Sequence, residues 1–157
     1  LDVERILNEI SPVSTEVSAE LVEASVERNP HGRPVLVADD SSVARKQVQR
    51  ALEAIGVQCV LAKDGREALN MLLEMAKQGP ILDQIALVIS DIEMPEMDGY
   101  TFTAEIRNNP NLKDLHVILH TSLSGVFNQA MVQKVGANNF IAKFQPDELA
   151  KAVQGAL

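Results

Sequence analysis

The stretch Ile85-Ala86-Leu87-Val88-Ile89-Ser90-Asp91 decides the fold. Five consecutive apolar residues, rich in β-branched types, run directly into an acid, and the run is too short and too uniformly apolar for an amphipathic surface helix. It predicts a strand that is buried on both faces. Asp91 then lies at the edge where open parallel sheets bind ligands. The alternative is an acid that merely begins a turn, because Pro95 and Asp98-Gly99 follow.

Four further apolar runs alternate with segments of helical spacing. The strands expected beside 85–90 are 35–38, 57–62, 117–119 and 140–142, and the expected helices are 43–55, 66–77, 100–107, 127–135 and 146–157. Parallel strands need helix-length crossovers of fixed hand, so this alternation predicts an α/β doubly wound fold. A five-stranded parallel sheet of order 2-1-3-4-5, the flavodoxin-like arrangement, is the common solution.

Polar side chains end four of these strands. The predicted order places Asp39 and Asp40, which follow the first strand, beside Asp91, which follows the third. Converging carboxylates repel each other unless a cation neutralises them or some stay protonated. A divalent cation resolves the repulsion, and an oxygen-only ligand set of this size favours Mg²⁺. Thr121 and Lys143 follow the fourth and fifth strands at the same edge. Turn chemistry explains any one of the five, but all five together indicate a functional site.

These five residues, with the Met-Pro-Glu-Met-Asp-Gly segment 94–99, resemble the receiver domain of two-component response regulators. The resemblance implies that a histidine kinase transfers a phosphoryl group to Asp91. It also implies that Asp40 and Asp91 bind Mg²⁺ directly, that Asp39 assists through water, and that the main-chain carbonyl of Glu93 completes the protein ligands.

Three more roles follow from the same resemblance. Lys143 is expected to hold a phosphoryl oxygen, and Thr121 to move and donate a hydrogen bond to the phosphoryl group. Phe140 is then expected to turn inward as part of a switch, although an aromatic residue on the fifth strand is by itself more typical of core packing. The physical chemistry agrees, because phosphoryl transfer to a carboxylate depends mainly on positioning and on neutralising charge.

Three short strings narrow the resemblance: Leu1–Leu7, His120–Gly125 and Asn139–Phe144. They are similar to CheV, a family of chemotaxis coupling proteins in which a CheW-like domain precedes a receiver. The similarity implies that residues 1–33 are the end of a CheW-like domain and a linker, and that 34–157 are the receiver. Its implied partners are a chemotaxis histidine kinase and, through the CheW-like domain, the chemoreceptor-kinase array. Phosphorylation is expected to tune that coupling or to serve as a phosphate sink.

Composition excludes other classes of partner. A net charge of -8 argues against sequence-independent contacts with nucleic acid and against attraction to anionic membranes. No apolar run approaches the length of a membrane span. The single cysteine, Cys59, suits a reducing cytoplasm and is expected to be buried filler. The histidines show no metal-ligand spacing, which favours surface or strand-end positions for them.

Two rival functions remain open at this stage. One is an enzyme, a phosphohydrolase with an Asp nucleophile, for which Glu93 could supply the second acid; the separate Asp39-Asp40 pair counts against it. The other is a receiver-fold module that binds a partner without phosphorylation. The intact set of site residues favours a phosphoacceptor rather than either rival, and therefore a protein that is not an enzyme.

Overall fold

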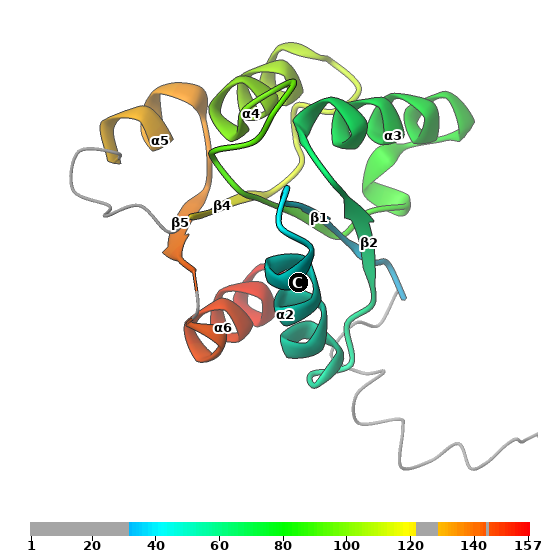
Figure 1. The fold of residues 1–157 in the computed structure, drawn as a ribbon. Coiled ribbons are helices and arrows are strands. Elements are labelled where there is room, and N and C mark those ends of the chain that lie inside the picture. Colours follow the sequence, from blue (N-terminus) through cyan, green and yellow to red (C-terminus); the bar gives the residue numbers. More distant parts are fainter. Residues whose placement is uncertain (1–31, 122–128, 144) are drawn as a thin grey trace, which may run out of the picture.

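Five parallel strands form one sheet in the computed structural model, which describes residues 32–121, 129–143 and 145–157. The strand order is β2-β1-β3-β4-β5, as predicted (Figure 1). The strands are β1 (Val35–Ala38), β2 (Cys59–Ala62), β3 (Leu87–Ser90), β4 (Val117–Thr121) and β5 (Asn139–Ala142). All four neighbouring pairs are parallel, so every strand presents its carboxyl end to the same edge of the sheet.

Helices cover both faces of the sheet. Those described are α2 (Ser42–Glu53), α3 (Gly65–Gln78), α4 (Gly99–Asn108), α5 (Gln129–Val135) and α6 (Pro146–Ala156), with a short 3-10 turn, η1 (Ile81–Asp83). Figure 1 shows α2 and α6 on one face and α3, α4 and α5 on the other. Within the described ranges, no helix combines the length and apolar character needed to cross a membrane.

Each face of the sheet has its own apolar core because successive strand residues point to opposite sides. On β1, Leu36 packs with residues of α3 and α4, whereas Val35 and Val37 pack with residues of α2 and α6. The central strands β1, β3 and β4 are buried along their whole length, and the edge strands β2 and β5 are only partly buried. This explains why the central strands read as continuous apolar runs.

Side chains in the loops that follow β1, β2 and β3 cap the helices that come next. Ser41, Asp64 and Asp98 are N-caps of α2, α3 and α4, and their side-chain oxygens accept hydrogen bonds from the backbone N–H of Ala44, Glu67 and Thr101 at 3.2, 2.8 and 2.7 Å. Caps of this kind satisfy N–H groups that the helix itself leaves unpaired. The turn expected at Asp98-Gly99 is therefore the beginning of α4.

Element boundaries in the described residues differ from the predicted ones by at most two residues. β2 begins at Cys59 rather than Val57 and β3 at Leu87 rather than Ile85, whereas β4 continues to Thr121. Propensity places these ends poorly because hydrogen bonding to a neighbouring strand decides them. Two parts of the predictions lie outside the described residues. They are residues 1–31 of the segment expected to be the end of a CheW-like domain and a linker, and the expected helix start at Phe127.

Arg107 joins the end of α4 to the beginning of β5. Its guanidinium donates to the carbonyl oxygens of Gly136, Lys113 and Leu115 at 2.8, 2.9 and 2.6 Å and to Asn138 Oδ1 at 2.7 Å. Several donors in a fixed planar geometry suit such a set of acceptors, which the single ammonium of lysine cannot reproduce. The side chain thereby fixes the position of the turn that leads from α5 into β5.

Gly99 allows α4 to begin directly against the loop that follows β3. Its N–H donates to the carbonyl of Ile92 at 2.8 Å. A Cβ at this position would overlap the carbonyl oxygen of Asp91 and lie 2.9 Å from the Cα of Ile92. Because both neighbours are backbone atoms, the clash cannot be relieved by rotating a side chain.

We expect Gly99→Ala to lower the free energy of unfolding by about 1–3 kcal/mol through this overlap. The matched control is Gly155→Ala in α6, where an added Cβ meets no atom within 4 Å. That substitution should leave stability unchanged or raise it by up to about 1 kcal/mol, because alanine favours helix. Urea unfolding of both variants provides the comparison, and equal effects would contradict the proposed close approach.

Candidate functional site

Three carboxylates converge at the carboxyl edge of the sheet. Asp39 and Asp40 follow β1, and Asp91 follows β3. The N–H of Asp91 donates to the carbonyl of Ala38 at 2.8 Å. One carboxylate oxygen from each acid lies within 4.8 Å of the others. The side chains of Asp39 and Asp91 are buried, at 1% and 4% exposure, whereas Asp40 is exposed. The predicted meeting of the three acids is therefore confirmed.

The ammonium of Lys143 lies between the two buried acids. Its Nζ is 3.0 Å from Asp39 Oδ2 and donates a hydrogen bond to Asp91 Oδ2 at 3.2 Å. The other oxygen of each acid accepts from the backbone: Asp39 Oδ1 from the N–H of Ser41 at 2.9 Å, and Asp91 Oδ1 from the N–H of Ile92 at 2.8 Å. Both carboxylates are thus held in fixed orientations by the strand ends and by one cation.

Burial and mutual repulsion set the protonation of this cluster. Burial, together with the neighbouring charge of Asp39, raises the pKa of Asp91 from 3.8 to about 6, although Lys143 and the Ile92 N–H oppose the shift. Burial alone would lower the pKa of Lys143, but the hydrogen bonds and charges of the two acids outweigh it and the pKa is raised. At neutral pH, Asp91 is therefore mostly ionised and available as a nucleophile.

The donor set fits a hard divalent cation. The three acids offer only carboxylate oxygens as metal ligands, which hard cations prefer. Their three negative charges face the single positive charge of Lys143. Asp39 Oδ2 is buried and accepts no hydrogen bond of good geometry, even though the ammonium is close. A buried carboxylate oxygen with unused acceptor capacity favours a further positive partner.

The remaining predicted residues surround this cluster. Thr121, at the end of β4, is 1% exposed, and its carbonyl accepts a hydrogen bond from the N–H of Lys143 at 2.7 Å. Phe140 pairs with Leu119, so it lies on the same face of the sheet as Thr121, and it packs partly buried against the core on that face. The side chain of Glu93 is exposed. Core packing of Phe140 is thus observed, whereas its role in a switch stays a prediction.

Two interactions at the site escaped the sequence analysis. Arg45 Nη1 donates to the carbonyl oxygen of Asp39 at 2.6 Å and ties α2 to the acidic loop. Its position one helical turn after the N-cap Ser41 could have suggested this. His120 was expected at a surface or strand end; it is in β4 but only 5% exposed. The alternation of β4, which directs it toward α2 and α6, was the available signal.

The fold and the geometry of its acidic edge agree with a family comparison. The sequence pattern of the response regulator receiver domain matches residues 35–154. The chain therefore belongs to the response regulator receiver domain family. Its fold is also similar to the chemotaxis response regulator CheY4 of Vibrio cholerae, with a TM-score of 0.67 and 30% identity over 80% of this chain and 98% of that one.

Curated relatives include several chemotaxis proteins. The chain is 28% identical to chemotaxis protein CheV1 of Helicobacter pylori over 98% of its own length and 47% of the relative's. It is 31% identical to protein PilG of Pseudomonas aeruginosa, covering 82% of this chain and 90% of that protein. The chain thus spans about half the length of CheV1. The predicted receiver identity and the similarity to CheV proteins are confirmed, whereas the CheW-like assignment of residues 1–33 stays a prediction.

The raised pKa of Asp91 predicts a dependence of stability on pH. Because the native pKa of about 6 exceeds the ordinary value of 3.8, the native state binds more protons than the unfolded state between these values. Ionisation of Asp91 therefore lowers the free energy of unfolding progressively as pH rises from about 4 to 6, by roughly 1–3 kcal/mol in total. Above that range its effect is constant. Asp91→Asn should remove this slope and be relatively more stable at pH 7.5.

Urea unfolding in chelator at pH 4.5 and 7.5 measures the effect as a difference between the parent and Asp91→Asn. His120 contributes an opposite slope, because burial lowers its pKa to about 4 and Lys143 adds to that shift, against the charge of Asp39. This contribution is common to both proteins and cancels in the difference. Stabilities that change in parallel with pH would contradict the raised pKa.

Proposed function

We propose that the chain is a phosphoacceptor receiver in which Asp91 accepts a phosphoryl group from a histidine kinase. The observation that carries the proposal is the geometry around Asp91, whose buried carboxylate lies 3.2 Å from the ammonium of Lys143 and within reach of two further acids. Membership of the receiver family supports it. In this role the protein is a substrate of a kinase rather than an enzyme.

The transfer is a substitution at phosphorus. An oxygen of the Asp91 carboxylate forms the new P–O bond while the P–N bond of the phosphohistidine breaks, and the donor imidazole leaves with the electron pair. The Ile92 N–H holds one oxygen of the nucleophile, which fixes the direction of the other. Lys143, which now contacts both buried acids, would transfer its hydrogen bond to a phosphoryl oxygen.

The acids would hold the magnesium ion that this charge distribution favours. Asp40 and Asp91 would bind it directly and Asp39 through water, with the main-chain carbonyl of Glu93 as a further ligand. When bound, the ion supplies positive charge that neutralises the phosphoryl oxygens. The unused acceptor capacity of Asp39 Oδ2 and the close approach of the three acids support this assignment.

Thr121 and Phe140 would report phosphorylation. The phosphoryl group adds roughly two negative charges and strong acceptors at the strand ends, where the buried Thr121 hydroxyl can donate to them. Movement of Thr121 would free space on the face that it shares with Phe140, whose ring is only partly buried. The aromatic ring would then turn inward, which is a two-state change driven by a local charge.

Chemotaxis signalling is the setting that the relatives favour. Among proteins similar to this chain, CheV1 is a chemotaxis protein and CheY4 a chemotaxis response regulator. The partners would be a chemotaxis histidine kinase in the cytoplasm and, through a preceding CheW-like domain, the chemoreceptor-kinase array. Phosphorylation would tune receptor-kinase coupling or withdraw phosphoryl groups as a sink.

Incubation of the chain with Mg²⁺ and acetyl phosphate should add the mass of one phosphoryl group, measured by intact-mass spectrometry. Asp91→Asn should show no gain, because the amide is not a nucleophile for this reaction. The matched control is Asp98→Asn, an exposed acid in the following loop whose role as N-cap asparagine can retain. Gain by Asp91→Asn, or none by the parent when Mg²⁺ is bound, would contradict the proposal and leave a binding module.

Magnesium binding is tested separately by thermal unfolding. Saturating Mg²⁺, about 100 times its Kd, should raise the Tm of the parent by about 5–10 °C, since a ligand that binds only the native state stabilises it. Asp40→Asn should lose most of this increase. Glu93→Gln should keep it, because the proposed ligand is the main-chain carbonyl and the side chain is exposed. An undiminished increase in Asp40→Asn would argue against the assigned ligands.

A further inference from the structure

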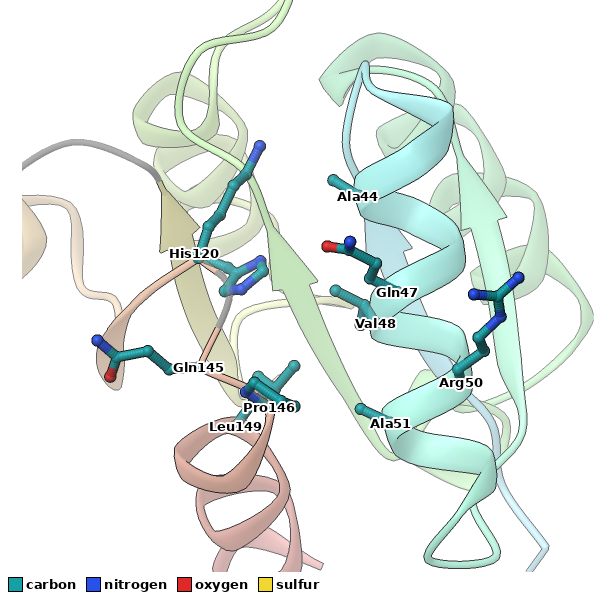
Figure 2. A pocket seen from close by; sticks show the side chains of 10 residues that line it. Ala44, Gln47, Val48, Arg50, Ala51, His120, Gln145, Pro146 and Leu149 are labelled. Carbon is teal, nitrogen blue, oxygen red and sulfur yellow. The ribbon is translucent and has the colours of Figure 1, made fainter.

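A cavity of about 450 Å³ lies between α2 and α6. Lys143, which contacts the buried acids of the phosphoryl site, is one of its lining residues. Its walls are mostly apolar and come from Ala44, Val48 and Ala51 of α2 and from Pro146 and Leu149 of α6. Figure 2 shows the α2 side chains facing His120 across this space, with Pro146 and Leu149 at one end. The volume is within the range of natural small-molecule pockets, roughly 300–1,000 Å³.

His120 gives this cavity a specific polar group. His120 is only 5% exposed. Its imidazole forms no hydrogen bond with any other residue in the described part of the chain. Burial chiefly lowers its pKa to about 4, so the ring is neutral at pH 7 and offers one N–H donor and one nitrogen acceptor. Because the residue lines the cavity, these groups are available to a molecule inside it.

Charge at the cavity restricts what can enter. The ionisable side chains that line it besides His120 are Lys143 and Arg50, and no acid lines it. Asp39 and Asp91 pair with Lys143 from outside the lining. A positive group on a ligand would therefore find no acid on the cavity walls to pair with, and it would meet the guanidinium of Arg50. The apolar walls favour a ring or a short apolar body, and His120 favours one N–H or O–H group on it.

We propose that this cavity is a binding site for a small aromatic molecule that carries one hydrogen-bond donor and no positive charge. The ring packs between Ala51 and Leu149, and its donor is directed to the imidazole of His120. Binding at this site does not require phosphorylation. Lys143 lines the cavity and also contacts Asp39 and Asp91, so an occupant restricts its movement and slows phosphoryl transfer; this coupling rests on the proposed function.

The first test uses indole as the probe, with the full chain in chelator and no phosphodonor. The protein has no tryptophan, so indole fluorescence reports the probe alone. We expect saturable one-to-one binding with a Kd of about 5 mM or lower, and amide shifts at His120 and Ala51 in nitrogen-15 NMR spectra. Tryptamine, the cationic analogue, should bind at least about 3-fold more weakly.

Variants separate the cavity from other surfaces. Ala51→Phe fills the cavity and should abolish binding, whereas Ala54→Phe, an exposed residue of the same segment outside the lining, should bind like the parent. His120→Leu removes the hydrogen bond and should weaken binding about 3–10-fold. Absence of saturable binding up to about 10 mM, or equal binding by Ala51→Phe, would overturn the site; the NMR shifts of the parent decide the matter if a variant does not fold.

The coupling is measured last. Indole should slow phosphorylation of the parent by acetyl phosphate and leave the rate of Ala51→Phe unchanged. Indole that binds without altering the parent's rate would refute the coupling while leaving the binding site in place. A parent that takes no phosphoryl group would refute the proposed function instead, and the binding result would stand.

Discussion

The ion pairs of Lys143 with Asp39 and Asp91 are the interaction on which the rest of the site depends. Two buried carboxylates at one sheet edge need a neutralising cation or a proton on one of them, because each is removed from water and repels the other. Lys143 supplies that cation from the far end of the sequence, at 3.0 and 3.2 Å. The raised pKa of Asp91 shows that one ammonium compensates the burial and repulsion only in part. Such a partly compensated site favours an additional positive charge.

The sheet makes this interaction possible through its register. β1 pairs with β3, β3 with β4 and β4 with β5, all in parallel. These four strands therefore end at one edge of the sheet, although their residues are widely separated along the chain. Both faces of β1 and β3 are buried in the core, and this packing fixes the positions of the carboxyl ends of these strands. The geometry of the acidic site thus follows from backbone pairing, and the side chains need only have the right chemistry and length.

Much of this could be predicted because the central strands are buried on both faces and therefore appear as unbroken apolar runs that stop at Asp39 and Asp91. What could not be predicted depended on distances between elements. Gly99 looks like a turn residue until the carbonyl of Asp91 is seen beside it. His120 looks like a strand-end histidine, and only the packing of α2 and α6 makes it the polar group of a cavity. Arg107 gives no local signal, because its acceptors lie in other elements.

Gly99 and Arg107 lie near opposite ends of α4, and together they make this helix a strut. At one end, the backbone of Gly99 packs closely against the carbonyl of Asp91. At the other end, the guanidinium of Arg107 donates hydrogen bonds to Gly136 and Asn138. A helix of 10 residues is about 15 Å long and resists compression along its axis. A displacement of the loop after Asp91 would therefore be transmitted along α4 to the turn before β5. The loop at the acidic site and the turn at the start of β5 are thus connected by one short, stiff helix.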